Sequence, residues 1–204
     1  MLVTDAVRRI KRQFGDEYDV FITDDDIYGW IYAAELDIIR NAGANDSTVD
    51  STVGAFPVSV PAAVKISRVS INGSALRSIS KEELDLVGVA DTVNAAPSYW
   101  YMFNKLVNLY PQEAGSTTAV KITYSKTPVM MVGLPSAQTF SVPENFHQDV
   151  VNFCLARAHN KNNDARAEEA MQNLYDRALG LRNDEAQTND GPTYKLDDPM
   201  DYPG

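Results

Sequence analysis

The chain has 204 residues, of which 44% are hydrophobic, and a formal net charge of -10 at pH 7. This length predicts one medium-sized domain, and the acidic charge excludes the basic face that free binding to nucleic acid or anionic membranes requires. A single cysteine, Cys154, excludes an intramolecular disulfide framework. The sequence shows no signal-peptide pattern, and no apolar run approaches the roughly 20 residues that span a membrane. We therefore expect a soluble protein made in the cytoplasm.

Two amphipathic helices are expected within residues 1–44. In the first, TDAVRRIKRQFG, Thr4 is the expected N-cap and Gly15 the expected end, with an apolar stripe opposite a basic one. The second, TDDDIYGWIYAAELDIIRNAG, is expected to begin after Thr23. Its three aspartates resemble a metal-binding cluster, but their position directly after a cap favours contacts with the exposed N–H groups of the first turn.

Residues 45–142 are expected to form a β-rich insertion. The polar composition of residues 45–54 predicts a loop. After it, VPAAVKISRVSINGSALRSIS holds two β-branched runs around an Asn-Gly dipeptide, which predicts a hairpin. KEELD predicts a helical turn, SYWYMFNKLVNLYP a pair of strands with an Asn-Lys bend, and TTAVKITYSKTP one more strand. Together they predict one small antiparallel sheet.

Helical periodicity returns in residues 143–182. Pro143 opens the helix predicted in VPENFHQDVVNFCLARAHNKN, and Asp164 caps the one predicted in ARAEEAMQNLYDRALGLRN. This pair should pack on the N-terminal pair, because each alone exposes an apolar stripe. The predicted fold class is therefore α+β: an antiparallel bundle of about four helices, an inserted antiparallel sheet, and an extended acidic tail at residues 183–204.

Residues with catalytic or metal-binding potential are few. His147 and His159 lie twelve residues apart on one predicted helix. Such a separation is about 18 Å, too far to share a metal ion. The sequence has no nucleophile elbow and no glycine-rich phosphate loop, and the apolar neighbours of Cys154 favour a buried thiol over a nucleophile. We therefore expect no enzyme activity, no bound metal and no cofactor.

Two surface features could contact partners. Alternation in SYWYMF places Trp100 and Tyr101 on opposite faces of a strand, so the predicted sheet has large apolar groups on both faces. One face can pack on the helices, and the other is covered either by a loop or by a partner. The basic stripe that includes Arg8 and Arg12 is either a solvated helix face or a contact for an acidic neighbour, such as the tail of an adjacent copy.

The order and spacing of these elements resembles the head-to-tail adaptor proteins of tailed bacteriophages, especially the short-tailed ones. The resemblance covers residues 5–180. It rests on the order and spacing of five segments rather than on a short diagnostic motif. They are VRRIKRQFGDEYDVFITDDDIYGWIYAAELDIIRNAG, SRVSINGSALRSISKEELD, APSYWYMFNKLVNLYP, AVKITYSKTP and VPENFHQDVVNFCLARAHNKNNDARAEEAMQNLYDRAL.

The resemblance implies a structural virion protein in the neck, between the capsid portal and the tail. It implies a ring of about twelve copies around the DNA exit channel. The implied partners are the portal protein, other copies of the chain, a tail or nozzle protein below, and double-stranded DNA that passes without specific binding. An acidic channel suits this passage, since carboxylates repel phosphate. No membrane contact, catalytic residue or cofactor is implied.

The tail, residues 183–204, carries six carboxylates and one lysine. We expect it to be disordered in the free monomer and to fold onto the portal or a neighbouring copy. Each of its large apolar side chains could contribute about 1.5–3 kcal/mol when buried on a partner, and its carboxylates would contact a basic surface. The candidate contacts are Tyr194, Leu196, Met200, Tyr202, Asp197 and Asp198.

Three other functions are compatible with the sequence. The chain could form a ring at another neck position, as a tail-completion or stopper protein. It could be a small-molecule or carbohydrate-binding module that uses Trp100 and Tyr101 as a platform, or an enzyme of unrecognised type. A long polar tail favours the ring proteins, because a ligand-binding module has no use for one.

Overall fold

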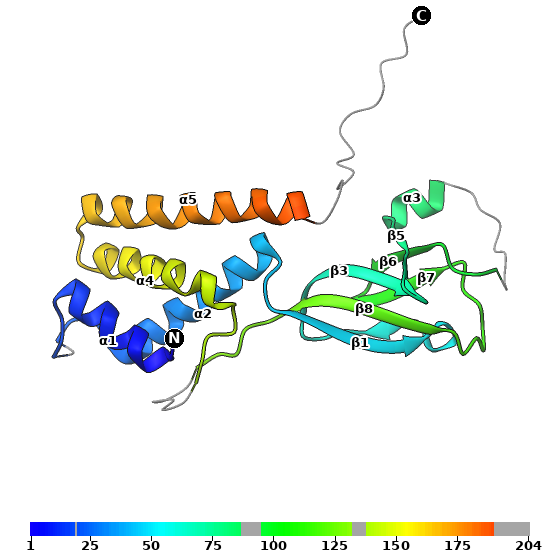
Figure 1. The fold of residues 1–204 in the computed structure, drawn as a ribbon, viewed down its shortest axis with the longest axis horizontal. Coiled ribbons are helices and arrows are strands. Elements are labelled where there is room, and N and C mark those ends of the chain that lie inside the picture. The colour runs from blue at the N-terminus through cyan, green and yellow to red at the C-terminus, as the bar shows by residue number, and fades with distance from the viewer. Residues whose placement is uncertain (19, 87–94, 132–137, 190–204) are drawn as a thin grey trace, which may run out of the picture.

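The structure is a computed structural model that describes residues 1–18, 20–86, 95–131 and 138–189. The four long helices gather in one lobe and the strands in another, and the two lobes lie end to end along the long axis (Figure 1). The predicted mixture of helix and sheet, the α+β class, is confirmed. Each lobe has its own cluster of buried apolar side chains, so the two pack largely independently.

The helical lobe is built around α4, which packs against α1, α2 and α5. The helices are α1 (Val3–Phe14), α2 (Asp24–Ala42), α4 (His147–Lys161) and α5 (Ala165–Asn189), and the short 3-10 helix η2 (Glu144–Phe146) precedes α4. The apolar stripes of these helices meet in one core. Its fully buried members include Ile10, Ile22, Ile27, Ile31, Ile38, Val150, Cys154 and Tyr175.

Three expected helix ends, at Gly15, Thr23 and Asp164, agree with the structure, and Pro143 precedes η2 rather than α4 itself. Thr23 and Asp26 form a reciprocal capping box at the start of α2. Asp164 accepts a hydrogen bond of 3.2 Å from the backbone N–H of Ala167, and α1 ends at a left-handed Gly15. The expected N-cap at Thr4 is wrong. Helix α1 already begins at Val3, whose N–H donates to the carbonyl oxygen of Gln138 at 3.0 Å, so a side-chain cap is not needed there.

Helix α5 extends seven residues further than the sequence pattern predicts. We expected the tail to begin at Asn183, but α5 continues to Asn189. The segment NDEAQTN has no apolar stripe, yet it contains good helix formers. Adding a residue to an existing helix is far easier than nucleating one, so the helix propagates into this polar segment. Residues 190–204, with every candidate tail contact, lie outside the described residues.

The β lobe has two four-stranded sheets among its described residues, not the single sheet that we predicted. The first, in the order β1-β8-β3-β4, contains β1 (Asp46–Thr52), β8 (Ala119–Lys126), β3 (Ala63–Ile71) and β4 (Ser74–Ala75). The second, in the order β2-β7-β6-β5, contains β2 (Val58–Ser59), β7 (Leu106–Tyr110), β6 (Tyr99–Phe103) and β5 (Arg77–Ser78). The lobe also holds η1 (Val53–Ala55) and α3 (Lys81–Leu86).

Strand pairing in this lobe follows the predicted turns only in part. Both predicted bends have left-handed backbone, with φ of 49° and 84° at Asn72 and Gly73 and 51° and 63° at Asn104 and Lys105. However, β5 pairs with β6 in parallel. Strand β4 has only two residues, and after it the chain crosses to the second sheet. Local alternation gives the faces of a strand but not its partner, so this crossing was not predicted.

Strand β1 replaces the loop that we predicted at residues 45–54. It pairs with β8 along its whole length, from Asp46 opposite Ser125 to Thr52 opposite Ala119. The polar composition indicated a loop, but β1 is an edge strand whose exposed side chains alternate with half-buried ones. Its partner is more than sixty residues away in sequence, so no local signal reports the pairing.

Gly54 in η1 is required by a close approach of two backbones. A Cβ at this position would lie 2.8 Å from the carbonyl oxygen of Ser116 and 2.9 Å from the nitrogens of Gly115 and Ser116. Gly54→Ala is therefore expected to lower the free energy of unfolding by about 2–3 kcal/mol, measured by urea denaturation. The control is Gly29→Ala in α2, where nothing lies within 4 Å. That change should stabilise the helix by about 0.5–1 kcal/mol. Equal effects of the two substitutions would contradict the close approach.

Candidate partner-binding surface

The basic residues predicted for partner contact are exposed on α1. The side chains of Arg8 and Arg12 are 79% and 80% exposed. Each lies 3.7 Å from one carboxylate, Asp5 for Arg8 and Glu17 for Arg12. Exposed pairs at this distance contribute little to stability, so both guanidinium groups can be recruited by an acidic partner at small cost.

Trp100 does not lie on an exposed face. It is 8% exposed and packs between the two sheets with Val107, Leu109 and Ile122. One face of the sheet could have packed on the helices; α2 does contact β3 and β8, but the second sheet covers the buried apolar face. The platform proposed for a carbohydrate or small-molecule module is therefore absent at Trp100, and we do not retain that residue as a partner contact.

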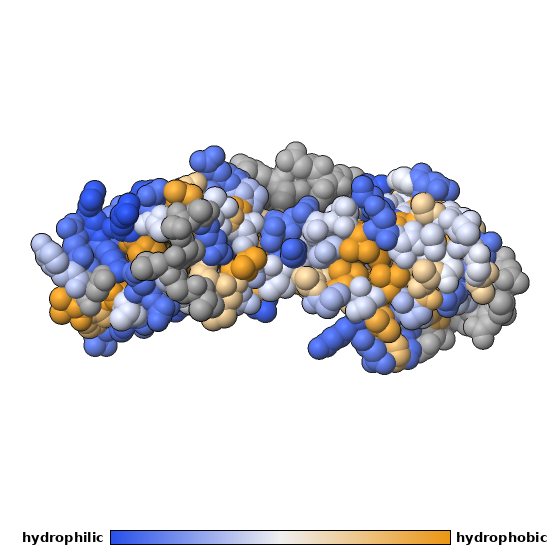
Figure 2. Space-filling view, turned by 90° about the horizontal axis from the view of Figure 1, so that it is seen from below, coloured by the Kyte–Doolittle hydropathy of each residue, from blue (hydrophilic) through white to orange (hydrophobic). Residues whose placement is uncertain are grey.

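The loop between α1 and α2 is a surface that the sequence pattern did not single out. Tyr18 and Val20 are 89% and 85% exposed, the highest exposures of any large hydrophobic residue in the described chain. Phe21 is also partly exposed. Figure 2 shows hydrophobic residues at the end of the helical lobe farthest from the β lobe, where this loop lies. In the sequence, the available signal was four apolar residues, Tyr18 and residues 20–22, within a loop of nine.

A buried aspartate holds this loop in place. The carboxylate of Asp16 accepts backbone N–H bonds from Val20, Phe21 and Ile22 at 2.9, 2.8 and 2.6 Å. These bonds, led by that of Ile22, lower the pKa of Asp16. Lys11 pairs with Asp24 at the base of the loop and so ties α1 to α2. The side chains of Val20 and Phe21 therefore stand on a backbone held by hydrogen bonds.

The two histidines each have local structural partners. His147 lies 3.2 Å from both the amino group of Met1 and the carbonyl oxygen of Val142, and burial lowers its pKa. His159 contacts Phe14 edge to face and lies 3.8 Å from Asp164. Within the described chain, no group of three or more His, Cys, Asp or Glu residues could hold a metal ion. Cys154 is fully buried, which raises the pKa of its thiol.

Glu35 is a buried carboxylate that secures the return of the chain from the β lobe. It lies on α2 with no exposed surface, and it accepts hydrogen bonds from the backbone N–H groups of Ser141 and Val142. Its second oxygen has no hydrogen-bond partner. Burial raises the pKa of Glu35 to about 7. With His147 bound to the carbonyl of Val142, this carboxylate fixes residues 141–142 to the helical lobe.

The two chain crossings between the lobes are also tied to each other. The backbone N–H of Lys126 donates to the carbonyl oxygen of Asn45 at 3.0 Å, and the Asn45 side-chain amide donates in return to the Lys126 carbonyl oxygen at 3.0 Å. The β lobe is thus attached at one restrained point, next to the segment that Glu35 holds. This arrangement presents the loop of the helical lobe and the β lobe at opposite ends of one molecule (Figure 1).

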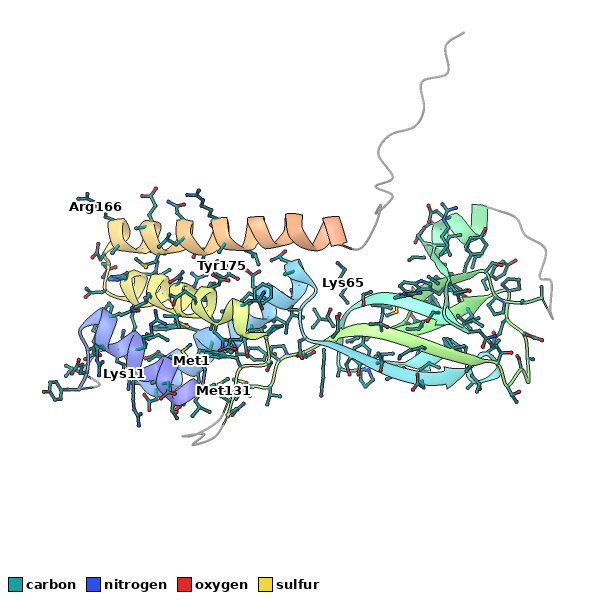
Figure 3. All side chains as sticks on the ribbon, viewed as in Figure 1. Met1, Lys11, Lys65, Met131, Arg166 and Tyr175 are labelled. Carbon is teal, nitrogen blue, oxygen red and sulfur yellow. The ribbon has the colours of Figure 1, made fainter. Side chains whose placement is uncertain are left out.

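Tyr175 projects from α5 into the helical core (Figure 3), where its hydroxyl donates a 2.6 Å bond to Asp37 of α2. Burial and this bond raise the pKa of the phenol. Tyr175→Phe should lower the free energy of unfolding by about 1.5–3 kcal/mol, because the bond is to a charged acceptor. The control is Tyr28→Phe, a buried tyrosine without a hydrogen-bond partner in the described structure, which should change stability by less than about 0.5 kcal/mol. Urea denaturation measures both, and equal losses would contradict the assignment.

None of the helices in the described part of the chain combines the length and the apolar character that crossing a membrane requires. What the described surface offers instead is a constrained apolar loop, a neighbouring basic stripe and two lobes joined at one point.

Comparison with known proteins identifies the family. The sequence model of the SU10 adaptor proteins matches residues 1–195, which include both lobes. The chain therefore belongs to the SU10 adaptor protein family, and the resemblance to phage head-to-tail adaptors is confirmed. No curated protein matches the chain.

Proposed function

We propose that this chain forms a ring beneath the portal of a tailed bacteriophage, where it joins the capsid to the tail and surrounds the DNA exit channel. The ring consists of about twelve copies, in keeping with the closed symmetry of homo-oligomers. Its role is structural, without catalysis or cofactor. The observation that carries the proposal is the family match, which runs through both lobes and continues past the end of α5.

The surface of the molecule is suited to such a ring. Large apolar side chains exposed on a constrained loop are a feature of binding surfaces, because they contribute nothing to the fold of the single chain. The elongated shape gives each copy two distant ends, one of which can face the portal and the other the tail (Figure 1). The residues after Asn189 supply a segment that can dock on the portal or on a neighbouring copy.

The net charge of -10 is compatible with a DNA conduit. Carboxylates along a channel repel the phosphate backbone, so the duplex passes without being held. A basic lining would instead bind DNA with release of counterions and slow its passage.

The ring can be tested by the mass that the chain adds to its portal. Purified portal rings are mixed with the chain and weighed by mass photometry. Because one copy has a mass of 22.5 kDa, binding of twelve copies adds 270 kDa in a single step. Unchanged portal mass at saturating chain concentration would overturn the proposal, whereas a smooth distribution of masses would argue against a closed ring.

A further inference from the structure

Strand β1 has an open edge that is much longer than the other edges of the two sheets. It has seven residues, whereas the other edge strands of the described sheets, β2, β4 and β5, have two residues each. Its pairing with β8 continues without a bulge from Asp46 to Thr52, and in Figure 1 it forms the lower margin of the β lobe. The strand lacks lysine, proline and bulges, three devices that commonly prevent a further strand from pairing with an edge.

Hydrogen bonds at the two ends of β1 show which of its backbone groups point toward β8. The N–H of Lys126 donates to the carbonyl oxygen of Asn45, and the N–H of Val53 donates to that of Thr118, both at 3.0 Å. Hydrogen-bonded positions alternate along an antiparallel pair, so the odd-numbered residues of β1 face β8. The N–H and C=O groups that point to the open edge therefore belong to Asp46, Thr48, Asp50 and Thr52.

The sequence of β1, DSTVDST, is complementary to itself in an antiparallel pair. When the outward-facing positions of two copies pair over the whole strand, Val49 lies opposite the Val49 of the second copy. Serine then faces serine, and each carboxylate lies opposite a hydroxyl that can donate to it: Asp46 faces Thr52, and Asp50 faces Thr48. Val49 is half-buried against the β-lobe core, so the paired valines continue that core across the contact.

The aspartates favour this register over its neighbours. Outward-facing positions remain paired only when one strand slips by two residues at a time. A slip in one direction places Asp46 opposite Asp50, and a slip in the other places two Asp50 side chains opposite each other. Like charges directly opposite are destabilising, so the register that pairs all seven residues is also the one that opposes no carboxylates. Lys121 of β8, opposite Asp50, offsets the charge of the two Asp50 side chains that then lie diagonally.

We propose that the open edge of β1 binds the β1 strand of a second copy of this chain. The two strands pair antiparallel about a two-fold axis at Val49, which joins the four-stranded β1-β8-β3-β4 sheets of both copies into one continuous sheet. The contact is isologous, so it links two copies and does not repeat around a cyclic ring. It belongs to free chains, and entry into the proposed ring requires the pair to separate. The pairing itself does not rest on the proposed ring.

Disulfide formation at single positions tests the register. Val49→Cys and Ser47→Cys are introduced separately into the full-length chain, in which both positions are half-buried and Cys154 is buried. Across the two-fold axis, position 49 faces itself with Cα atoms about 4.5 Å apart, which is within disulfide range. Position 47 faces position 51, so its two copies lie roughly 13 Å apart along the strands. Under mild oxidation, Val49→Cys should give at least tenfold more covalent dimer than Ser47→Cys, and equal yields would overturn the inference.

A proline tests the backbone contact without interrupting the pairing with β8. The N–H of Thr48 points to the open edge, and proline is tolerated at such positions of edge strands. Thr48→Pro should weaken self-association at least tenfold. Sedimentation equilibrium at chain concentrations up to about 1 mM measures it, a range suited to the weak complexes that small contacts form.

The matched control is Thr48→Ser, which keeps the N–H and the hydroxyl and should change the dissociation constant less than twofold. Circular dichroism verifies that both variants keep the fold. Self-association that persists in Thr48→Pro, or an unmodified chain that stays monomeric over the whole concentration range, overturns the inference.

Loading of portal rings distinguishes this contact from the proposed function. Thr48→Pro should add the same mass to portal rings as the unmodified chain, because a two-fold contact has no place in the ring. Loss of loading in this variant would put the β1 edge inside the ring and overturn the inference. A chain that loads portals but never self-associates would refute only the β1 pair and leave the adaptor function intact. A chain that self-associates but leaves portals bare would refute the ring and leave the pair intact.

Discussion

Replacing Glu35 by alanine is expected to lower the free energy of unfolding by roughly 3–5 kcal/mol. The substitution removes the acceptor of two backbone N–H groups, on Ser141 and Val142, at a fully buried position. It also leaves a cavity between α2 and the returning chain. Urea denaturation at pH 6 measures the loss. A change below about 1 kcal/mol would show that the carboxylate does not hold this segment.

Glu35→Gln provides the matched control, because it keeps an acceptor oxygen without the ionisable group. Burial raises the pKa of Glu35 from 4.5 to about 7 in the folded chain. Between these two values the folded carboxyl is protonated while the unfolded one is ionised, so the folded state holds the extra proton. Stability from this group is therefore fully present below pH 4.5 and is lost as the pH rises toward 7, by about 3 kcal/mol in total.

The glutamine variant should lack this loss. Its stability relative to the unmodified chain is expected to increase from pH 5 to pH 8, as measured by urea denaturation at each pH. Burial lowers the pKa of the neighbouring His147, which makes the fold less stable as the pH falls below about 6.5. That histidine is present in both proteins, so its contribution cancels in the difference. A difference that does not vary with pH would contradict the raised pKa of Glu35.

Ending the chain at Asn189 is expected to preserve the fold and to weaken the proposed ring at least a hundredfold. The buried residues of both core clusters all precede this position, so urea denaturation should give a nearly unchanged free energy of unfolding. The lost segment holds four large apolar side chains, each of which could contribute about 1.5–3 kcal/mol when buried on a partner. Part of that gain is offset by ordering the segment, and a hundredfold effect requires only about 2.7 kcal/mol of the remainder.

Titration of portal rings with the chain, read by mass photometry, measures this effect. The control is a full-length chain in which Tyr194, Leu196, Met200 and Tyr202 are all replaced by serine, which keeps the length and the charge. It should behave like the truncated chain, since the apolar anchors supply most of the binding. Occupancy of the portal by the truncated chain at the same concentration as the full chain would refute the role of this segment.

The helical lobe was largely predictable because its signals are local. Apolar periodicity located α1, α2, α4 and α5, and the Thr23 cap was visible as a threonine followed by acidic residues. The errors were at the ends. The first turn of α1 is supported by the distant Gln138, and α5 continues by propagation through polar residues. Neither cause can be read from a short window of sequence.

The β lobe was less predictable because its architecture depends on distant pairs. Turn residues located the bends at Asn72 and Asn104 correctly. They could not reveal that β1 pairs with β8, or that β5 lies in parallel beside β6. This pairing also changed a functional prediction. Alternation along the strand left Trp100 available to a partner, but the second sheet buries it.

Only part of the candidate surface was predictable from the sequence. Arg8 and Arg12 were evident as a basic stripe on an amphipathic helix. Tyr18 and Val20 were not, because a connecting loop with apolar residues has several structural explanations. The structure adds the exposure of both side chains and the hydrogen bonds to Asp16 that hold the backbone of residues 20–22.

The most direct test of the adaptor function is cryo-electron microscopy of the purified portal mixed with the full-length chain. We expect one closed ring of copies on one face of each portal, coaxial with its channel and leaving an open path wide enough for double-stranded DNA. Portal particles that remain bare at saturating chain concentration, or copies bound without closing around the channel, would contradict it.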